Sequence, residues 1–229
     1  MTGTRAITRL LRGVPASSEQ SPVVSGFGLE LRQWDESLVR QMADWGVRGF
    51  PYQAFDLNHL RDRKRASVAL AGVRNNTQHR HFVACEGGVA VGRVSLNLKD
   101  PAGLYIWSVH VPPEHEGRGV ARRMVALLME SLESLDPAGP DFVLATHTFA
   151  VRAHRTYFAL GFSIAETKWT FDSEIARDLW TADHDLREPL TDHVRFRNGR
   201  WEVHTHIMRR AHGTPFSLLP NAKPVLSEV

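Results

Sequence analysis

The sequence predicts a single α+β domain in which helices flank a central, mixed and mostly antiparallel twisted sheet. Several short apolar runs are joined by turn signals that suit hairpins, and two strands of the second half each lead directly into an amphipathic helix. The 229 residues, 42% apolar and 23% charged, are typical of one globular domain. We place this domain at residues 26–210, between an N-terminal arm at 1–25 and a proline-rich tail at 211–229.

The first half of the domain is predicted from alternation, a helix cap and a glycine turn. The expected elements are a strand at 28–34, helices at 38–45 and 56–71, and strands at 81–86, 89–96 and 104–111. Leu29 and Leu31 alternate as one face of a strand does, and Asp56 is placed to cap the second helix. Gly87 and Gly88 suit the turn of a hairpin, so we expect antiparallel pairing here.

The second half is expected to join two strand-and-helix units to a final hairpin. The expected elements are helices at 119–135 and 150–160, strands at 142–147 and 162–171, and a hairpin that turns at 198–199. An apolar stripe with the helical period favours the first helix, which Asp136-Pro137 ends. Gly161 suits the C-terminal cap of the second helix, and Asn198-Gly199 is a strong hairpin signal.

Composition excludes several classes of protein. No apolar run approaches the roughly 18 to 20 residues that a membrane span requires. The single cysteine, Cys85, excludes an intramolecular disulfide framework and a cysteine-based zinc site. A net charge of +3 without a concentrated basic face does not favour a nucleic-acid partner. We therefore expect a cytoplasmic protein with neither membrane nor nucleic acid as a partner, and we leave a homodimer open.

The segment VHVPPEHEGRGVARRMV, residues 109–125, combines a strand, a glycine loop and a helix. Gly117 and Gly119 allow the backbone to approach a ligand with its N–H groups turned inward. The first turn of the following helix adds unpaired N–H groups and a dipole that favours an anion. A phosphate or pyrophosphate is the expected occupant, with Arg118, Arg122 and Arg123 supplying positive charge.

Two other nucleotide-binding motifs do not fit this segment. A dinucleotide fingerprint needs a third glycine where Arg122 stands, and no GxxxxGK sequence is present. A strand-to-helix turn without a ligand is the remaining alternative.

The segment resembles the acyl-CoA-binding signature of the GNAT superfamily of N-acetyltransferases, Gln/Arg-x-x-Gly-x-Gly/Ala, here Glu116 to Ala121. Members of this superfamily also carry Asn-x-x-Ala-x-x-x-Tyr-x-x-x-Gly-Phe. The matching residues here are Ala150, Ala153, Tyr157, Gly161 and Phe162. Together with the hairpin at 199–201, the likeness is to the branch that contains ribosomal-protein and small-molecule acetyltransferases. Glu116 and Ala150 depart from the usual Gln or Arg and the usual Asn.

The resemblance implies acetyl-CoA as the acyl donor, no metal, and direct attack of an amine on the thioester. It assigns the pantetheine arm to the strand backbone at Val109 and Val111, where an N–H would polarise the carbonyl. It assigns the pyrophosphate to the loop and first helical turn, namely Glu116, Gly117, Arg118, Gly119, Val120, Ala121 and Arg122. The acceptor would be a primary amine of a small molecule, peptide or protein.

Two catalytic roles follow from the same resemblance. Tyr157 matches the general acid that protonates the departing thiolate, or it packs on the inner face of its helix. No carboxylate precedes the glycine loop to act as the base, so His110 and His147 are the candidates, with a water chain as the alternative. A non-catalytic CoA-binding or scaffold protein on the same fold is the alternative to an enzyme.

Charge is distributed unevenly along the chain. Residues 172–192 hold seven acids against two arginines, a local charge of −5 that leaves +8 for the rest. This acidic insertion is either a solvated helix or a flap whose field attracts a cationic amine acceptor. Paired histidines at 79 and 81 and at 204 and 206 lack further ligands with metal-binding spacing, and Cys85 is expected to be buried.

Overall fold

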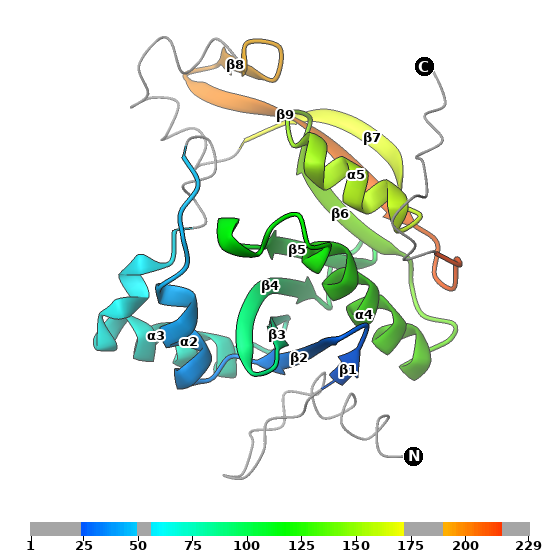
Figure 1. Cartoon of the computed structure of the whole chain (residues 1–229). Coiled ribbons are helices and arrows are strands. Elements are labelled where there is room, and N and C mark those ends of the chain that lie inside the picture. Colours follow the sequence, from blue (N-terminus) through cyan, green and yellow to red (C-terminus); the bar gives the residue numbers. More distant parts are fainter. Residues whose placement is uncertain (1–23, 50–55, 172–189, 217–229) are drawn as a thin grey trace.

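A mostly antiparallel sheet of nine strands forms the centre of the computed structural model, which describes residues 24–49, 56–171 and 190–216 (Figure 1). Its strand order is β1-β2-β3-β4-β5-β6-β9-β7, and β8 pairs with β9. The strands are β1 (Val24–Gly26), β2 (Leu29–Gln33), β3 (His79–Glu86), β4 (Val89–Asn97), β5 (Leu104–His110), β6 (Phe142–His147), β7 (Ser163–Thr170), β8 (Val194–Arg197) and β9 (Arg200–Arg210). This is the α+β architecture that the sequence predicts, with β1 as an additional strand.

Helices lie on the two faces of this sheet. They are α2 (Glu36–Ala43), α3 (Arg63–Asn75), α4 (Val120–Leu135) and α5 (Val151–Ala159), with short 3₁₀ turns η2 (Asn58–Arg61) and η3 (Pro113–His115). Successive side chains of β3 point to opposite faces of the sheet, so they contribute to two different cores. Phe82 and Ala84 join the core beneath α4, whereas Val83 and Cys85 join the core beneath α2 and α3. Cys85 is fully buried, as predicted.

The helix predicted at 56–71 is divided in the structure. Asp56 accepts a hydrogen bond from the N–H of Asn58 and starts only the short turn η2. The helix α3 begins after Asp62, whose backbone is extended and whose side chain accepts from the N–H of Arg65. Asp62 caps a helix of its own, whereas the N-cap of η2 is Leu57 and no side chain caps that turn, so the continuous helix was wrong.

The other expected elements are confirmed, and their ends agree with the expected ones to within two residues. The hairpin β3–β4 turns at Gly87 and Gly88, and β8–β9 turns at Asn198 and Gly199, all four with positive φ. The domain limits at 26 and 210 stay predictions. The arm at 1–23, the acidic residues 172–189 and the tail from 217 lie outside the described residues.

The pairing of β5 with β6 is the one parallel contact in the described sheet, and it is short. Leu104, Tyr105 and Ile106 pair with Phe142, Val143 and Leu144, and the pairing ends there. Beyond Ile106 the two strands continue to His110 and His147 without pairing to each other, and β6 continues its pairing with β9. The sheet therefore opens between the C-terminal ends of β5 and β6.

Candidate active site

A cavity of about 380 Å³ lies where β5 and β6 separate. Tyr105, Trp107 and Ser108 line it from β5, and His147 lines it from β6. The far wall comes from β9 and from the end of β7, at Thr205 and Phe171. Of the two histidines predicted as bases, His147 is the one that lines this cavity.

Ser108 has a backbone conformation that is rare for a residue with a side chain. Its φ is +53°, in the left-handed region. Arg93 on β4 pairs with His110 and Ser95 pairs with Trp107, so two residues of β5 oppose one of β4. This is a β-bulge, which leaves part of the backbone outside the ladder and is frequent beside active sites. Here the bulge lies at the start of the opening between β5 and β6.

The glycine loop has the geometry of an anion site. Gly117 and Gly119 have φ of +73° and +71°, and a Cβ at either position would meet no atom within 4 Å. Gly119 is the N-cap of α4, and no side chain caps that helix end. The N-cap therefore offers no side-chain acceptor to the backbone N–H groups of the first turn, which suit a phosphate. Val120 is buried in the core, so only its backbone faces the loop.

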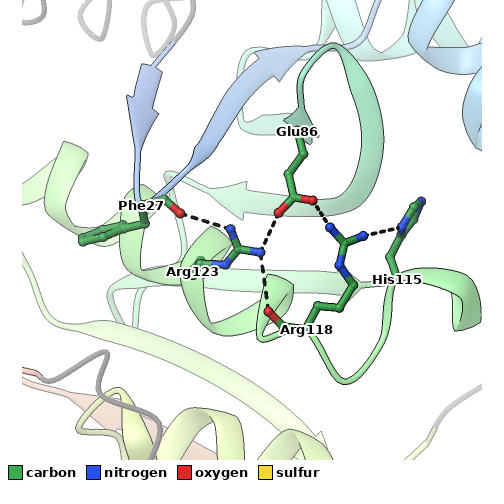
Figure 2. Close-up of polar contacts among 5 residues, drawn as sticks. All are labelled: Phe27, Glu86, His115, Arg118 and Arg123. Carbon is green, nitrogen blue, oxygen red and sulfur yellow. Dashed lines mark hydrogen bonds and ion pairs between the residues drawn. The ribbon is translucent and has the colours of Figure 1, made fainter.

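Arg118 in the loop and Arg123 in α4 both pair with Glu86, from the β3–β4 hairpin, whose single negative charge offsets one of their two positive charges (Figure 2). Its carboxylate pairs with Arg118 and accepts a hydrogen bond of 2.6 Å from Arg123. Arg123 also donates to the carbonyl oxygens of Phe27 at 3.1 Å and Arg118 at 3.5 Å. The hydrogen bonds that Glu86 accepts, above all the one from Arg123, lower the pKa of its carboxyl group. Arg118 and Arg123 thus hold the loop in place, and their charge is not directed at a phosphate alone.

Glu116 is neutralised in turn by two arginines from other elements. It pairs with Arg48, from the segment after α2, and accepts a hydrogen bond of 2.9 Å from Arg152 in the first turn of α5. A carboxylate beside a pyrophosphate site is unfavourable by itself, which is the cost expected from the sequence. The two guanidinium groups offset that cost and bring additional positive charge to the loop.

Tyr157 lies in the core beneath α4 and α5, with its ring 6.0 Å from that of Phe162. Burial raises the pKa of its phenol, and Tyr105 contributes to the same shift. The phenol is therefore protonated at neutral pH and is able to donate a proton. Tyr105, which contributes to the raised pKa of Tyr157, is also a residue of the cavity lining.

His110 and His147 differ in their surroundings. His110 is buried with its ring 5.6 Å from that of Trp45, and burial followed by the charges of Arg93 and Arg48 lowers its pKa to about 3. An imidazole with so low a pKa is a weak proton acceptor. His147 is partly exposed and its Nδ1 lies 3.3 Å from the hydroxyl of Thr205.

Several of the other described histidines pack against aromatic rings. Trp107 lies edge-on to His79 and His81 at 5.5 and 5.6 Å, and His204 stacks on Trp169 at 4.6 Å. Within residues 24–49, 56–171 and 190–216, no three His, Cys, Asp or Glu side chains gather as metal ligands would. No helix in those ranges is both long and apolar enough to cross a membrane.

Comparison with known families decides what this arrangement belongs to. The model of the acetyltransferase (GNAT) family matches residues 37–162, from α2 to the start of β7. The chain is a GNAT acetyltransferase. Members of this family use acetyl-CoA, and the chain is accordingly an acyl-CoA-dependent N-acetyltransferase. A search of curated protein sequences finds no match.

Solved structures of GNAT acetyltransferases share the fold at low sequence identity. A ribosomal L7/L12 α-N-protein acetyltransferase, RimL, is 15% identical over 86% of this chain and 98% of its own, with a TM-score of 0.51. The Escherichia coli ribosomal-protein-S18-alanine N-acetyltransferase is 13% identical over 83% and 98%, with a TM-score of 0.50. A spermidine N-acetyltransferase chimera from Vibrio cholerae SpeG and hSSAT is 16% identical over 81% and 96%, also at 0.50.

Three features of this GNAT site were absent from the sequence-based prediction. Glu86 was not recognised because it contacts the loop from a hairpin more than 30 residues upstream. The bulge at Ser108 has no local signal such as glycine. The aromatic wall was detectable, since Tyr105 and Trp107 alternate with the buried Ile106 and so share the opposite face.

Proposed function

We propose that this enzyme transfers the acetyl group of acetyl-CoA to a primary amine held in the cavity between β5 and β6. The observation that carries the proposal is the position of that cavity, beside the bulged end of β5 that leads into the glycine loop. A donor whose pyrophosphate binds the N-terminus of α4 would extend its thioester along β5 toward the opening. The acceptor amine would then reach the thioester from the cavity side.

The proposed donor site consists mainly of backbone. Gly117, Gly119 and the first turn of α4 offer N–H groups to the pyrophosphate, with Arg48 and Arg152 beside them. Val109 and Val111 are partly buried, with side chains that pack on the core, so their backbone is what faces a pantetheine arm. Backbone N–H groups at the bulge are suited to polarise the thioester carbonyl as it becomes an oxyanion.

The proposed reaction has one proton acceptor and one proton donor. His147 takes the proton of the acceptor ammonium, directly or through water, and the amine nitrogen forms a bond to the carbonyl carbon. The carbon–sulfur bond then breaks, and the thiolate takes the phenol proton of Tyr157. The second proton that the nitrogen loses as it becomes an amide returns to the phenolate through water, so Tyr157 is restored. We favour His147 over His110 because it lines the cavity, whereas burial lowers the pKa of His110 to about 3.

The test is thiol release from acetyl-CoA across a panel of primary amines. We expect turnover with at least one amine, and a fall in kcat of about 100-fold for His147→Gln, since general-base catalysis contributes roughly 10²- to 10⁴-fold. The KM for acetyl-CoA should stay within about twofold, because His147 makes no contact with the glycine loop. His206→Gln is the matched control, because His206 pairs with neighbouring Thr146 and hydrogen-bonds Thr167 outside the cavity. Unchanged kcat in His147→Gln would remove this residue from the base role.

A further inference from the structure

The cavity between β5 and β6 has an aromatic wall. Tyr105, Trp107 and Phe171 contribute three rings. The other described lining residues are small or neutral side chains, His147 apart. The three rings are therefore the largest side chains of the described lining.

Two of these rings expose large apolar surfaces. Trp107 is 36% exposed and Phe171 is 53% exposed, values that are high for such large apolar side chains. Trp107 is held edge-on against His79 and His81, so its ring presents a fixed surface to the cavity. A ligand that covers both rings would remove apolar area from water at roughly 25 cal/mol for each Å² buried. The wall therefore favours an apolar or aromatic body.

Aromatic faces also attract cations, which makes a polyamine the competing occupant. The ring of Phe171 already has a cation beside it, because the guanidinium of Arg200 lies 5.6 Å from its centre. The charge of Arg200 disfavours a second positive charge at this wall, although Glu202, 3.8 Å from Arg200, offsets part of it. An acceptor with a single amine avoids that repulsion.

We propose that the acceptor is a small primary monoamine with an aromatic or bulky apolar body, which packs on Trp107 and Phe171 while its amine faces His147. A volume of about 380 Å³ lies near the lower end of the range for small-molecule sites, and it suits one ring on a short chain. This acceptor class rests on the proposed function, because it names the substrate of the same cavity in which we propose N-acetyl transfer.

The experiment compares kcat/KM of the full-length enzyme for 2-phenylethylamine, ethylamine and spermidine. We expect 2-phenylethylamine to exceed both others by about tenfold or more, since apolar contacts of this size discriminate by roughly 10- to 200-fold. Trp107→Ala should lower kcat/KM for 2-phenylethylamine by about tenfold and leave that for ethylamine within about twofold. Phe196→Ala is the control, because Phe196 is a 52% exposed aromatic residue on β8 that does not line the cavity.

The outcomes separate the two proposals. A preference for spermidine, or an equal effect of Trp107→Ala on both monoamines, would overturn the aromatic acceptor and leave N-acetyl transfer in place. Failure of every amine to be acetylated would overturn the proposed function itself, and the acceptor class with it. The wild-type comparison does not depend on any variant, so a poorly folded Trp107→Ala protein leaves the test decisive.

Discussion

Glu116 stands where the family's loop signature usually has glutamine or arginine, and its two arginine partners explain how a carboxylate is accommodated there. The same pairing occupies guanidinium groups that a pyrophosphate would otherwise use. We expect Glu116→Gln to lower the KM for acetyl-CoA by about two- to fivefold, which is the size of a partly exposed ion pair. Steady-state kinetics at two salt concentrations measure this effect, with Glu166→Gln as a control for net charge. A raised KM would mean that the carboxylate positions Arg48 and Arg152 for the phosphates.

Tyr157 gives a second prediction for a single residue. Its phenol is buried and its pKa is raised, so the proton that it would give to a thiolate is present at neutral pH. Tyr157→Phe keeps the ring that packs on Phe162 and removes only the hydroxyl. We expect kcat to fall on the order of 10²-fold with the KM for acetyl-CoA nearly unchanged. Wild-type turnover in this variant would exclude Tyr157 as the general acid.

Single residues were predicted well from the sequence where their chemistry is local. Gly117 and Gly119 were recognised because a loop that approaches an anion needs residues without a Cβ, and both have positive φ in the structure. The partners of Arg118 could not be predicted in the same way. Glu86 reaches Arg118 only because β3 and β4 bring their hairpin beside the start of α4. Such pairing depends on tertiary arrangement rather than on spacing.

At the scale of elements, strand β5 shows what periodicity predicts and what it misses. Its limits were expected to within one residue, and its bulge was not, because serine has no preference for positive φ. The division of the helix at 56–71 was missed for a related reason. Asp62 reads as an ordinary exposed residue within a helical pattern, yet its extended backbone ends one segment and its side chain caps the next.

The bulge at Ser108 predicts a difference between two substitutions. A left-handed backbone costs a residue with a Cβ roughly 1 to 2 kcal/mol, and more for a β-branched one, whereas glycine adopts it readily. We expect Ser108→Val to lower the free energy of unfolding by about 1 to 2 kcal/mol and Ser108→Gly to leave it unchanged or slightly higher. Urea denaturation of both variants measures this. Equal stability of the two would show that the bulge is not kept in solution.

At the scale of the whole molecule, the cores on the two faces of the sheet and one opening in the described sheet organise the enzyme. The alternation of Leu29 and Leu31 in β2 and the stripe of α4 predicted buried residues, because those periods follow directly from strand and helix geometry. The opening between β5 and β6 was not predictable from period alone. It depends on how early their pairing ends, after Ile106 and Leu144, while β6 continues beside β9.

Three partly or fully buried histidines should make the stability of the whole molecule depend on pH. Burial lowers the pKa of His110 to about 3 and those of His81 and His154 to about 4, and the main neighbouring charges act in the same direction. Around His110 these charges are Arg93 and Arg48. At a pH well above about 6.5 the imidazoles are neutral in both the folded and the unfolded chain, so they cause no pH dependence there. Below about pH 6.5 the unfolded chain binds protons first, and the native state loses stability as the pH falls.

Urea denaturation at pH 7, 6 and 5 tests this expectation. The free energy of unfolding should fall from pH 7 to pH 5, because the unfolded state holds more protons throughout that range. His110→Gln should reduce the slope of the unfolding free energy against pH, since it removes one of the groups that titrate only after unfolding. Because His110 is buried, the reduction should approach one proton toward pH 5, or about 1.4 kcal/mol per pH unit. His59→Gln is the control. His59 lies on the short turn η2 and belongs to neither core, so this change should leave the slope unchanged. A free energy of unfolding that stays constant between pH 7 and pH 5 would contradict the neutral, buried state of these three imidazoles.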